Sequence, residues 1–151
     1  MPVFPIWYTL ELCVYKSVDD LRAAIKARGR QISSWAEELL DSKDFELTYQ
    51  KTNIELVIVT NAALGRPQGC QFEETVRLAV EQGLDLCPAD TAPQLFVDVR
   101  LTVATKPMAD ARGSPSVFRL ESGWLCRCYA DGPVSFRGGD YNFVFQRRKA
   151  A

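Results

Sequence analysis

The residue types that most often carry chemistry are unevenly represented in this chain. It has five cysteines and no histidine, so the commonest general base and the commonest metal ligand are both missing. Cys87 lies three residues before Asp90 and next to Pro88, which would place a thiol and a carboxylate at one rigid turn. A nucleophilic cysteine needs a histidine, a cation or a helix N-terminus to lower its pKa, whereas Asp90 would raise it. We therefore expect Cys87 to pack as a small apolar residue.

Carboxylates in the same part of the chain offer a second kind of chemistry. Two of them could share acid–base work, and several carboxylate oxygens could hold a divalent metal. No two stand out by their spacing. The candidates are Glu73, Glu74, Asp85, Asp90 and Asp98. No catalytic residue and no cofactor is predicted, but an enzyme with a carboxylate- or metal-dependent site at the Cys87–Asp90 turn stays as an alternative.

Cysteines near the end of the chain raise the question of zinc. Cys126 and Cys128 stand two apart in a predicted strand, so both would point to the same face. With Cys70 and Cys87 they would supply the four thiolate ligands of a structural zinc site. Structural zinc sites usually hold paired cysteines on turns, a pattern that a C-x-C run inside an apolar strand does not match. We therefore predict no metal site.

Charged and aromatic residues alternate along the predicted strands of the C-terminal half. If these strands pair as hairpins, basic side chains and a tyrosine would lie side by side on one outer sheet face. Mixed charge on a sheet is often only a solvated surface, but Arg and Tyr are also the residues that anchor interfaces. The predicted binding residues are Arg100, Arg119, Arg127, Tyr129 and, in the 131–140 loop, Arg137.

Two further basic features point toward nucleic acid or phosphate. The tail Arg147-Arg148-Lys149 follows alternating aromatic residues, as in surfaces that bind single strands. However, these aromatics also alternate as a core face would, and a net charge of −1 does not favour binding by bulk charge. Gly138-Gly139 is not followed by a helix that could hold a phosphate, so we predict a turn there. Nucleic-acid binding through the tail is a second alternative.

Length and composition are typical of one globular domain. The chain has 151 residues, of which 47% are hydrophobic and 25% charged, so we treat 1–151 as a single domain. The apolar start has no basic segment and is interrupted by Pro2 and Pro5, which argues against a signal peptide or a membrane span. Five cysteines cannot all pair within one chain. We therefore expect reduced thiols and a cytoplasmic, soluble protein.

Hydrophobic periodicity defines the elements that must position these residues. Helices are predicted after the cap Ser17, from Ser34, and from Phe72 to the glycine stop at Gly83. Strands are predicted at 6–15, 45–49, 54–60, 94–104, 116–122, 124–129 and 141–148. The order β-α-α-β-β-α-β-β-β-β predicts an α+β fold, with a mostly antiparallel sheet and about three helices packed mainly on one side.

The stretch from Phe72 to Val103 organises this scheme. Its helix should bury Phe72, Val76, Ala79 and Val80 at helical spacing. Pro88 and Pro93 then bracket a stiff turn, after which Leu95, Val97, Val99, Leu101 and Val103 should share the core face of the longest strand.

A short block within this stretch carries a resemblance. The residues are Gly83-Leu84-Asp85-Leu86-Cys87-Pro88-Ala89-Asp90 with Pro93-Gln94-Leu95, supported by Asp20–Ile25, Ile32–Ala36 and Glu55–Val59. With them, the whole chain resembles a family of small uncharacterised bacterial proteins. In that family glutamate is usual at Asp90, glycine at Ala92 and tryptophan at Arg137. The resemblance implies one coherent domain and brings no activity, cofactor or catalytic residue.

Together these observations predict a non-enzymatic binding or protein-interaction module. Its partner would be a protein or a small molecule, bound by the C-terminal sheet and the 131–140 loop. Neither nucleic acid nor a membrane is the favoured partner, and a homo-oligomer is left open.

Overall fold

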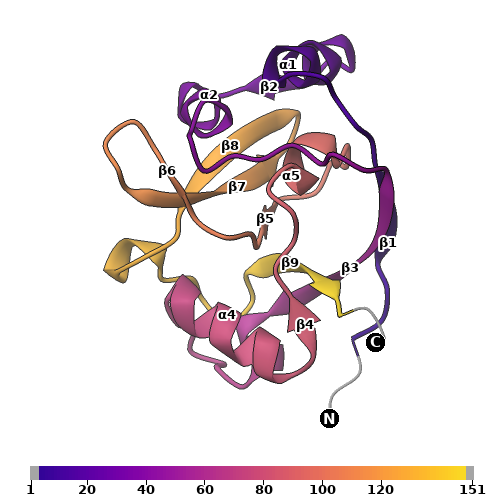
Figure 1. Ribbon diagram of the computed structural model, residues 1–151. Coiled ribbons are helices and arrows are strands. Elements are labelled where there is room, and N and C mark those ends of the chain that lie inside the picture. Colours follow the sequence, from indigo (N-terminus) through magenta and orange to yellow (C-terminus); the bar gives the residue numbers. More distant parts are fainter. Residues whose placement is uncertain (1–3, 149–151) are drawn as a thin grey trace.

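The computed structural model describes residues 4–148, and within them helices lie on both sides of one mixed sheet (Figure 1). The described chain contributes nine strands in the order β1-β3-β9-β5-β7-β8-β2, with β4 added to β9 and β6 to β7. The strands are β1 Tyr8–Leu12, β2 Gln31–Ile32, β3 Thr52–Thr60, β4 Leu84–Asp85, β5 Leu101–Val103, β6 Met108–Ala109, β7 Pro115–Glu121, β8 Trp124–Tyr129 and β9 Asn142–Arg147.

The predicted α+β class is confirmed, but the finer architecture was wrong. The described residues form five α-helices, and the pairs β2–β8 and β5–β9 are parallel, so the sheet is mixed. The helices are α1 Val18–Ala27, α2 Ser34–Leu40, α3 Asn61–Leu64, α4 Phe72–Glu81 and α5 Thr91–Gln94, with a 3-10 turn η1 at Pro133–Ser135. No helix in this part of the chain is long and apolar enough to cross a membrane.

The helices occupy both faces because the central strands are apolar on both. In β9, Val144 packs into a first core with α1, α2 and α5, whereas Phe143 and Phe145 pack into a second core under α3 and α4. Successive residues of a strand point to opposite faces, so a strand whose residues are all apolar must be buried by other elements on both faces of the sheet. The same arrangement holds in β3, where Leu56 lies in the first core and Val57 in the second.

The long strand predicted at 94–104 was wrong, because side chains draw its first half into a helical turn. The Gln94 side-chain amide donates to the Cys13 carbonyl and to Asp90 Oδ2, and its Oε1 accepts from Cys13 N–H at 2.8 Å. Pro93 is tolerated in α5 because the first turn of a helix needs no N–H there. Only Leu101–Val103 remains a strand, and Val99 is exposed.

The strand predicted at 45–49 is absent from the fold for a related reason. The N–H of Thr48 donates to Asp90 Oδ2 at 2.7 Å, so a side chain takes the donor that a strand ladder would need. The predicted order of elements is therefore wrong at these two places, and it also lacks the short elements β2, α3, β4 and β6.

Helix starts and faces were predicted with mixed success. Ser17 caps α1 as expected, but Ser33 rather than Ser34 caps α2, accepting from Ala36 N–H at 3.1 Å. In α4, Phe72 and Ala79 are buried while Val80 is 40% exposed. The buried polar position is Thr75, whose hydroxyl donates to the Asn61 side chain at 2.6 Å, and such pairing is what allows a polar group inside.

Candidate functional site

The five predicted binding residues do not share one surface, because the β7–β8 hairpin separates them. Its register pairs Arg119 with Cys126 and Phe118 with Arg127. Paired residues point to the same face and neighbours to opposite faces, so Arg119 and Arg127 lie on opposite sides of the sheet. The single predicted surface is corrected to two: Arg127 and Tyr129 on the α2 side, and Arg100, Arg119 and Arg137 on the other.

On the α2 side, Arg127 is a structural residue. Its Nη1 donates to Asp110 Oδ2 at 2.9 Å, with the two side chains only 7% and 2% exposed. The guanidinium also lies 4.4 Å from the Trp35 ring centroid and 4.0 Å from that of Tyr129. Burial alone would raise the pKa of Asp110, but the N–H groups of Ser114 and Arg112 and the charge of Arg127 hold it below its ordinary value. The Arg127 guanidinium is therefore buried and already paired, so it is not available to bind a partner.

On the opposite side, part of the sheet has no helix of the described chain packed against it. We call this surface the open face and define it by Arg100, Arg119, Glu121, Cys126 and Tyr141. Helices α3 and α4 pack over β3 and β4 on this side of the sheet, while the Arg100 side chain is 64% exposed. Two guanidiniums share one carboxylate here: Arg119 Nη2 lies 2.8 Å and Arg100 Nε 3.4 Å from the Glu121 oxygens. The group therefore carries one uncompensated positive charge.

Arg137 and the 131–140 loop lie beside the open face and are held firmly. Arg137 exchanges backbone hydrogen bonds with Cys70, its guanidinium donates to Cys128 Sγ at 2.8 Å, and its carbonyl accepts from the Asn61 amide. A Cβ on Gly139 would collide with the Pro67 carbonyl, which explains the Gly138-Gly139 pair by close backbone approach. Ser135 Oγ accepts from Phe72 N–H and so caps α4. The loop is a fixed edge of the surface.

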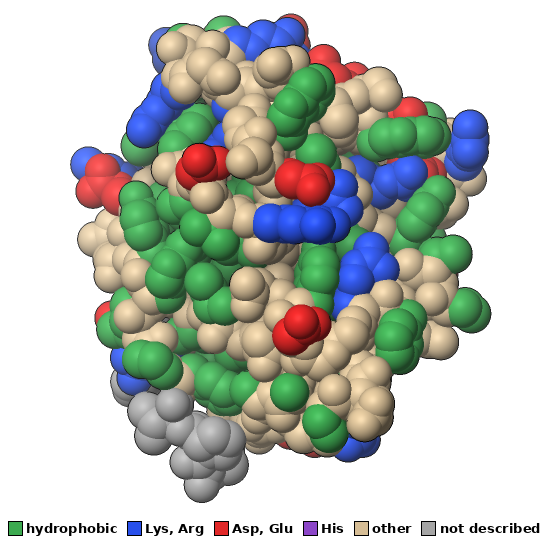
Figure 2. Space-filling model, turned by 180° about the vertical axis from the view of Figure 1, so that it is seen from behind, with side chains coloured by type: hydrophobic (Ala, Val, Ile, Leu, Met, Phe, Trp, Pro, Cys, Tyr) green, Lys and Arg blue, Asp and Glu red, His purple; other side chains and the backbone are tan. Residues whose placement is uncertain are grey.

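Figure 2 views the molecule from behind and shows how charged side chains are distributed over one face of it. Basic side chains are interspersed with acidic and hydrophobic ones, and no broad field of one sign forms on this face. Such a mixture suits contact with a protein better than binding to a nucleic-acid backbone, which needs a continuous basic patch.

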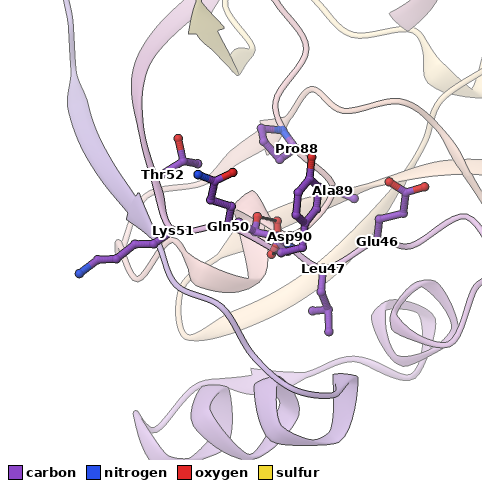
Figure 3. Close-up of a pocket in the computed structure, with 10 residues that line it drawn as sticks. Glu46, Leu47, Gln50, Lys51, Thr52, Pro88, Ala89 and Asp90 are labelled. Carbon is purple, nitrogen blue, oxygen red and sulfur yellow. Dashed lines mark hydrogen bonds between the residues drawn. The ribbon is translucent and has the colours of Figure 1, made fainter.

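The Cys87–Asp90 turn borders a cleft of about 520 Å³. Asp90, only 1% exposed, accepts from Thr48 N–H, from the Thr48 hydroxyl and from the Gln94 amide, at 2.7, 2.8 and 3.0 Å. Burial raises the pKa of Asp90 in spite of these bonds. Figure 3 shows Asp90, in the 88–90 segment, next to the 46–52 segment that lines the other side of the cleft, with the Lys51 side chain extending away from it. Asp90 therefore cross-links segments that are far apart in sequence.

The cysteines are dispersed through the fold. Cys87 belongs to the first core, where burial raises the pKa of its thiol far above the ordinary value and keeps it neutral. Cys128 belongs to the second core, on the other face of the sheet. Nowhere within residues 4–148 do three or more cysteine, aspartate or glutamate side chains group in a way that could hold a metal ion.

The described part of the basic tail also has a structural role. Arg148 donates to Asp85 and to the carbonyls of Val80 and Leu84, where it lies at the C-terminal end of α4. Arg147 is exposed, and Lys149 lies outside the described residues.

One polar cleft was missed by the sequence reasoning altogether. It lies where α1 ends and is lined by 28–30, 96–98 and 122–123. The signal for it was two arginines flanking a glycine at a helix end, Arg28-Gly29-Arg30, which is more often read only as a C-cap.

No protein-family model, no curated protein and no solved structure matches this chain. The family resemblance of the Gly83–Asp90 block therefore stays a prediction, and function has to be inferred from the chain's own residues.

Proposed function

We propose that this protein is a non-enzymatic interaction module that binds an acidic segment of a partner protein at the open face. The observation that carries the proposal is the sharing of Glu121 by two arginines. Arg100 and Arg119 both approach this one carboxylate, which leaves one guanidinium charge available to a carboxylate of a partner.

The surroundings of this pair support a protein partner. Tyr141 lies beside Arg119, with its hydroxyl 2.6 Å from that of Thr102, and the Arg137 guanidinium is 5.5 Å from the Tyr141 ring centroid. Trp124, opposite Glu121 in the β7–β8 register, is 40% exposed. Arginine, tyrosine and tryptophan are the residue types that dominate binding energy at protein interfaces.

The test compares proteins captured from a cell lysate by three forms of the purified chain. These are the wild type, the double variant Arg100→Ala with Arg119→Ala, and the control Arg77→Ala. Arg77 is an exposed arginine of α4. Like Arg100 and Arg119 it forms salt bridges with glutamate, in its case with Glu74 and Glu81, but it lies outside the open face. We expect a set of proteins to be lost only with the double variant, and peptides from their acidic segments to bind the wild type in a salt-sensitive way.

The same capture by the wild type and the double variant would refute the proposal. A second copy of the chain is also a testable partner, because it would appear as a dimer in sedimentation equilibrium that the double variant loses.

The enzymatic alternative at the Cys87–Asp90 turn has one supporting observation. A carboxyl with a raised pKa beside a cleft is a common feature of active sites. Against it, the cross-link to Thr48 and Gln94 already accounts for the burial of Asp90. The alternative requires that a divalent ion or a substrate raise the melting temperature, and that Asp90→Asn abolish this gain.

A further inference from the structure

The cleft at the end of α1 has a volume of about 540 Å³. A hollow of this size matches those that take metabolite-sized ligands. Its walls come from three separate parts of the chain: the end of α1, the segment after α5 and the turn between β7 and β8. It does not include the residues that define the open face, so this inference does not rest on the proposed function.

A buried arginine without a carboxylate partner lies in this cleft. Arg30 is 8% exposed, and Nη2 makes one long hydrogen bond of 3.4 Å to the Val97 carbonyl. Its Nη1 is buried and has no hydrogen-bond partner in the described part of the chain. A guanidinium stays protonated in proteins, and burying its charge is costly unless an anion compensates it. Arg127 has Asp110 for this purpose, whereas Arg30 has no such partner within bonding distance among residues 4–148.

A second arginine adds positive charge at the same place. The Arg28 guanidinium lies 3.9 Å and that of Arg30 4.8 Å from the centroid of the Phe96 ring, so two like charges lie against one aromatic side chain. Among the lining residues the carboxylate is Asp98, and it accepts a hydrogen bond from the Ser122 hydroxyl at 3.2 Å. Two cations and one anion leave the cleft with a net positive charge.

The backbone fixes the two arginines relative to one another. Gly29 has a φ of +81°, and Arg30 N–H donates back to the Ile25 carbonyl at 3.3 Å. These are the marks of a Schellman turn, which ends a helix in one defined geometry. The N–H groups of Arg28, Gly29 and Arg30 also satisfy carbonyls of the last turn of α1, which reduces the negative pole of the helix that would otherwise oppose an anion.

From these observations we propose that the cleft is an oxyanion-binding site, in which Arg28 and Arg30 together bind a carboxylate or a phosphate group. The ligand oxygens would accept from the exposed guanidinium of Arg28, beside the buried positive charge of Arg30, and the Phe96 ring would form the apolar wall. Both ion types fit, because a guanidinium offers two parallel donors to either of them. Asp98 competes with the ligand for the same positive charge.

The test measures stabilisation and binding with simple ions. Sodium phosphate and sodium citrate are titrated into the wild-type protein, with sodium chloride at equal ionic strength as the reference. An ion that binds the folded protein raises its melting temperature, so the melting temperature reports binding, and calorimetry gives the affinity. We expect a saturable rise with at least one of the two oxyanions beyond that with chloride. The ion that acts identifies the ligand as a phosphate or a carboxylate.

Variants then assign the effect to this cleft. Arg28→Gln and Arg30→Gln should each weaken binding roughly tenfold or more, because the first removes charge-assisted hydrogen bonds and the second removes the adjacent positive charge. Asp98→Asn should tighten binding, since the competing carboxylate is gone. Arg77→Gln, on α4 at the opposite end of the molecule from α1, should bind as the wild type does (Figure 1).

Two results would overturn the proposal. One is a response to both oxyanions no larger than that to chloride. The other is equal affinity in the wild type and in Arg28→Gln, a variant of an exposed side chain that should fold even if Arg30→Gln does not. Amide shifts of Gly29 and Gly123 on titration would support the location independently of any variant.

Discussion

Arg127 and Asp110 form a buried ion pair, 2.9 Å apart, that ties β8 to the turn between β6 and β7. Its carboxylate also accepts the N–H groups of Arg112 and Ser114, so the turn is organised around one charge. Arg30, by contrast, is a buried arginine whose Nη1 finds no partner among residues 4–148. The two arginines should therefore respond to the same substitution in opposite ways.

Arg127→Met should destabilise the protein by about 3 kcal/mol, because it leaves the buried carboxylate of Asp110 without its cation. The measurement is the free energy of unfolding from urea titration. A loss of less than about 1 kcal/mol would show that water or another donor replaces the guanidinium.

Arg30→Met should leave the free energy of unfolding unchanged or raise it by about 1 kcal/mol, because an uncompensated charge is replaced by an apolar side chain of similar length. The same urea titration measures it, and Arg127→Met is the matched comparison. If Arg30→Met lost as much stability as Arg127→Met, Arg30 would have a structural partner in solution. The anion site would then lose its main support.

The pKa values of the two buried aspartates should be shifted in opposite directions. Asp110 has a lowered pKa, so its stabilising effect is present above the unfolded value and is lost as pH falls through its folded pKa. Asp90 has a raised pKa, mainly through burial, so its charge opposes folding at neutral pH and protonation on acidification relieves that cost. Carboxyl carbon shifts in NMR, followed from neutral pH into acid, should show Asp90 titrating first. Titration of Asp110 before Asp90 would contradict both assignments.

Gly139→Ala should cost about 1–3 kcal/mol, because the added Cβ would meet the backbone of Pro67. Its neighbour provides the control: a Cβ on Gly138 would lie 3.5 Å from an Asp140 side-chain oxygen, an ordinary contact. Gly138→Ala should therefore change the free energy of unfolding by less than about 0.5 kcal/mol. Equal effects of the two substitutions in thermal unfolding would show that the 131–140 loop is not clamped as described.

The parts of the fold that could be predicted from sequence are those that depend on near neighbours. The Ser17 cap, the apolar run of β3 and the alternation in β9 all follow from residues a few positions apart. The segment 94–100 was mispredicted because Gln94 bonds to Cys13, 81 positions away, and no local pattern reports such a bond. The alternation of apolar residues alone favours a strand there, but the hydrogen bonds between the Gln94 side chain and the Cys13 backbone stabilise the helical turn α5 instead.

The error at the candidate surface has a different origin. The hairpin β7–β8 turns over Ser122 and Gly123, which makes Arg119 the partner of Cys126 and places Arg127 on the other face. The face on which each arginine lies follows from the two-residue length of the turn. The opposite placement of Arg119 and Arg127 could therefore be predicted from the sequence. The cleft at Arg30 could not be found in this way, because Phe96 and Ser122 reach it only through the tertiary fold.

The place of β9 in the sheet has a consequence for how the chain is made. Residues 142–147 follow every other described element in sequence, yet the strand lies between β3 and β5 and pairs with both. During translation the two sides of the sheet would emerge from the ribosome separately, each with an unpaired strand edge where β9 belongs. They can close into one structure only after β9 is synthesised, and until then both unpaired strand edges are open to edge-to-edge association.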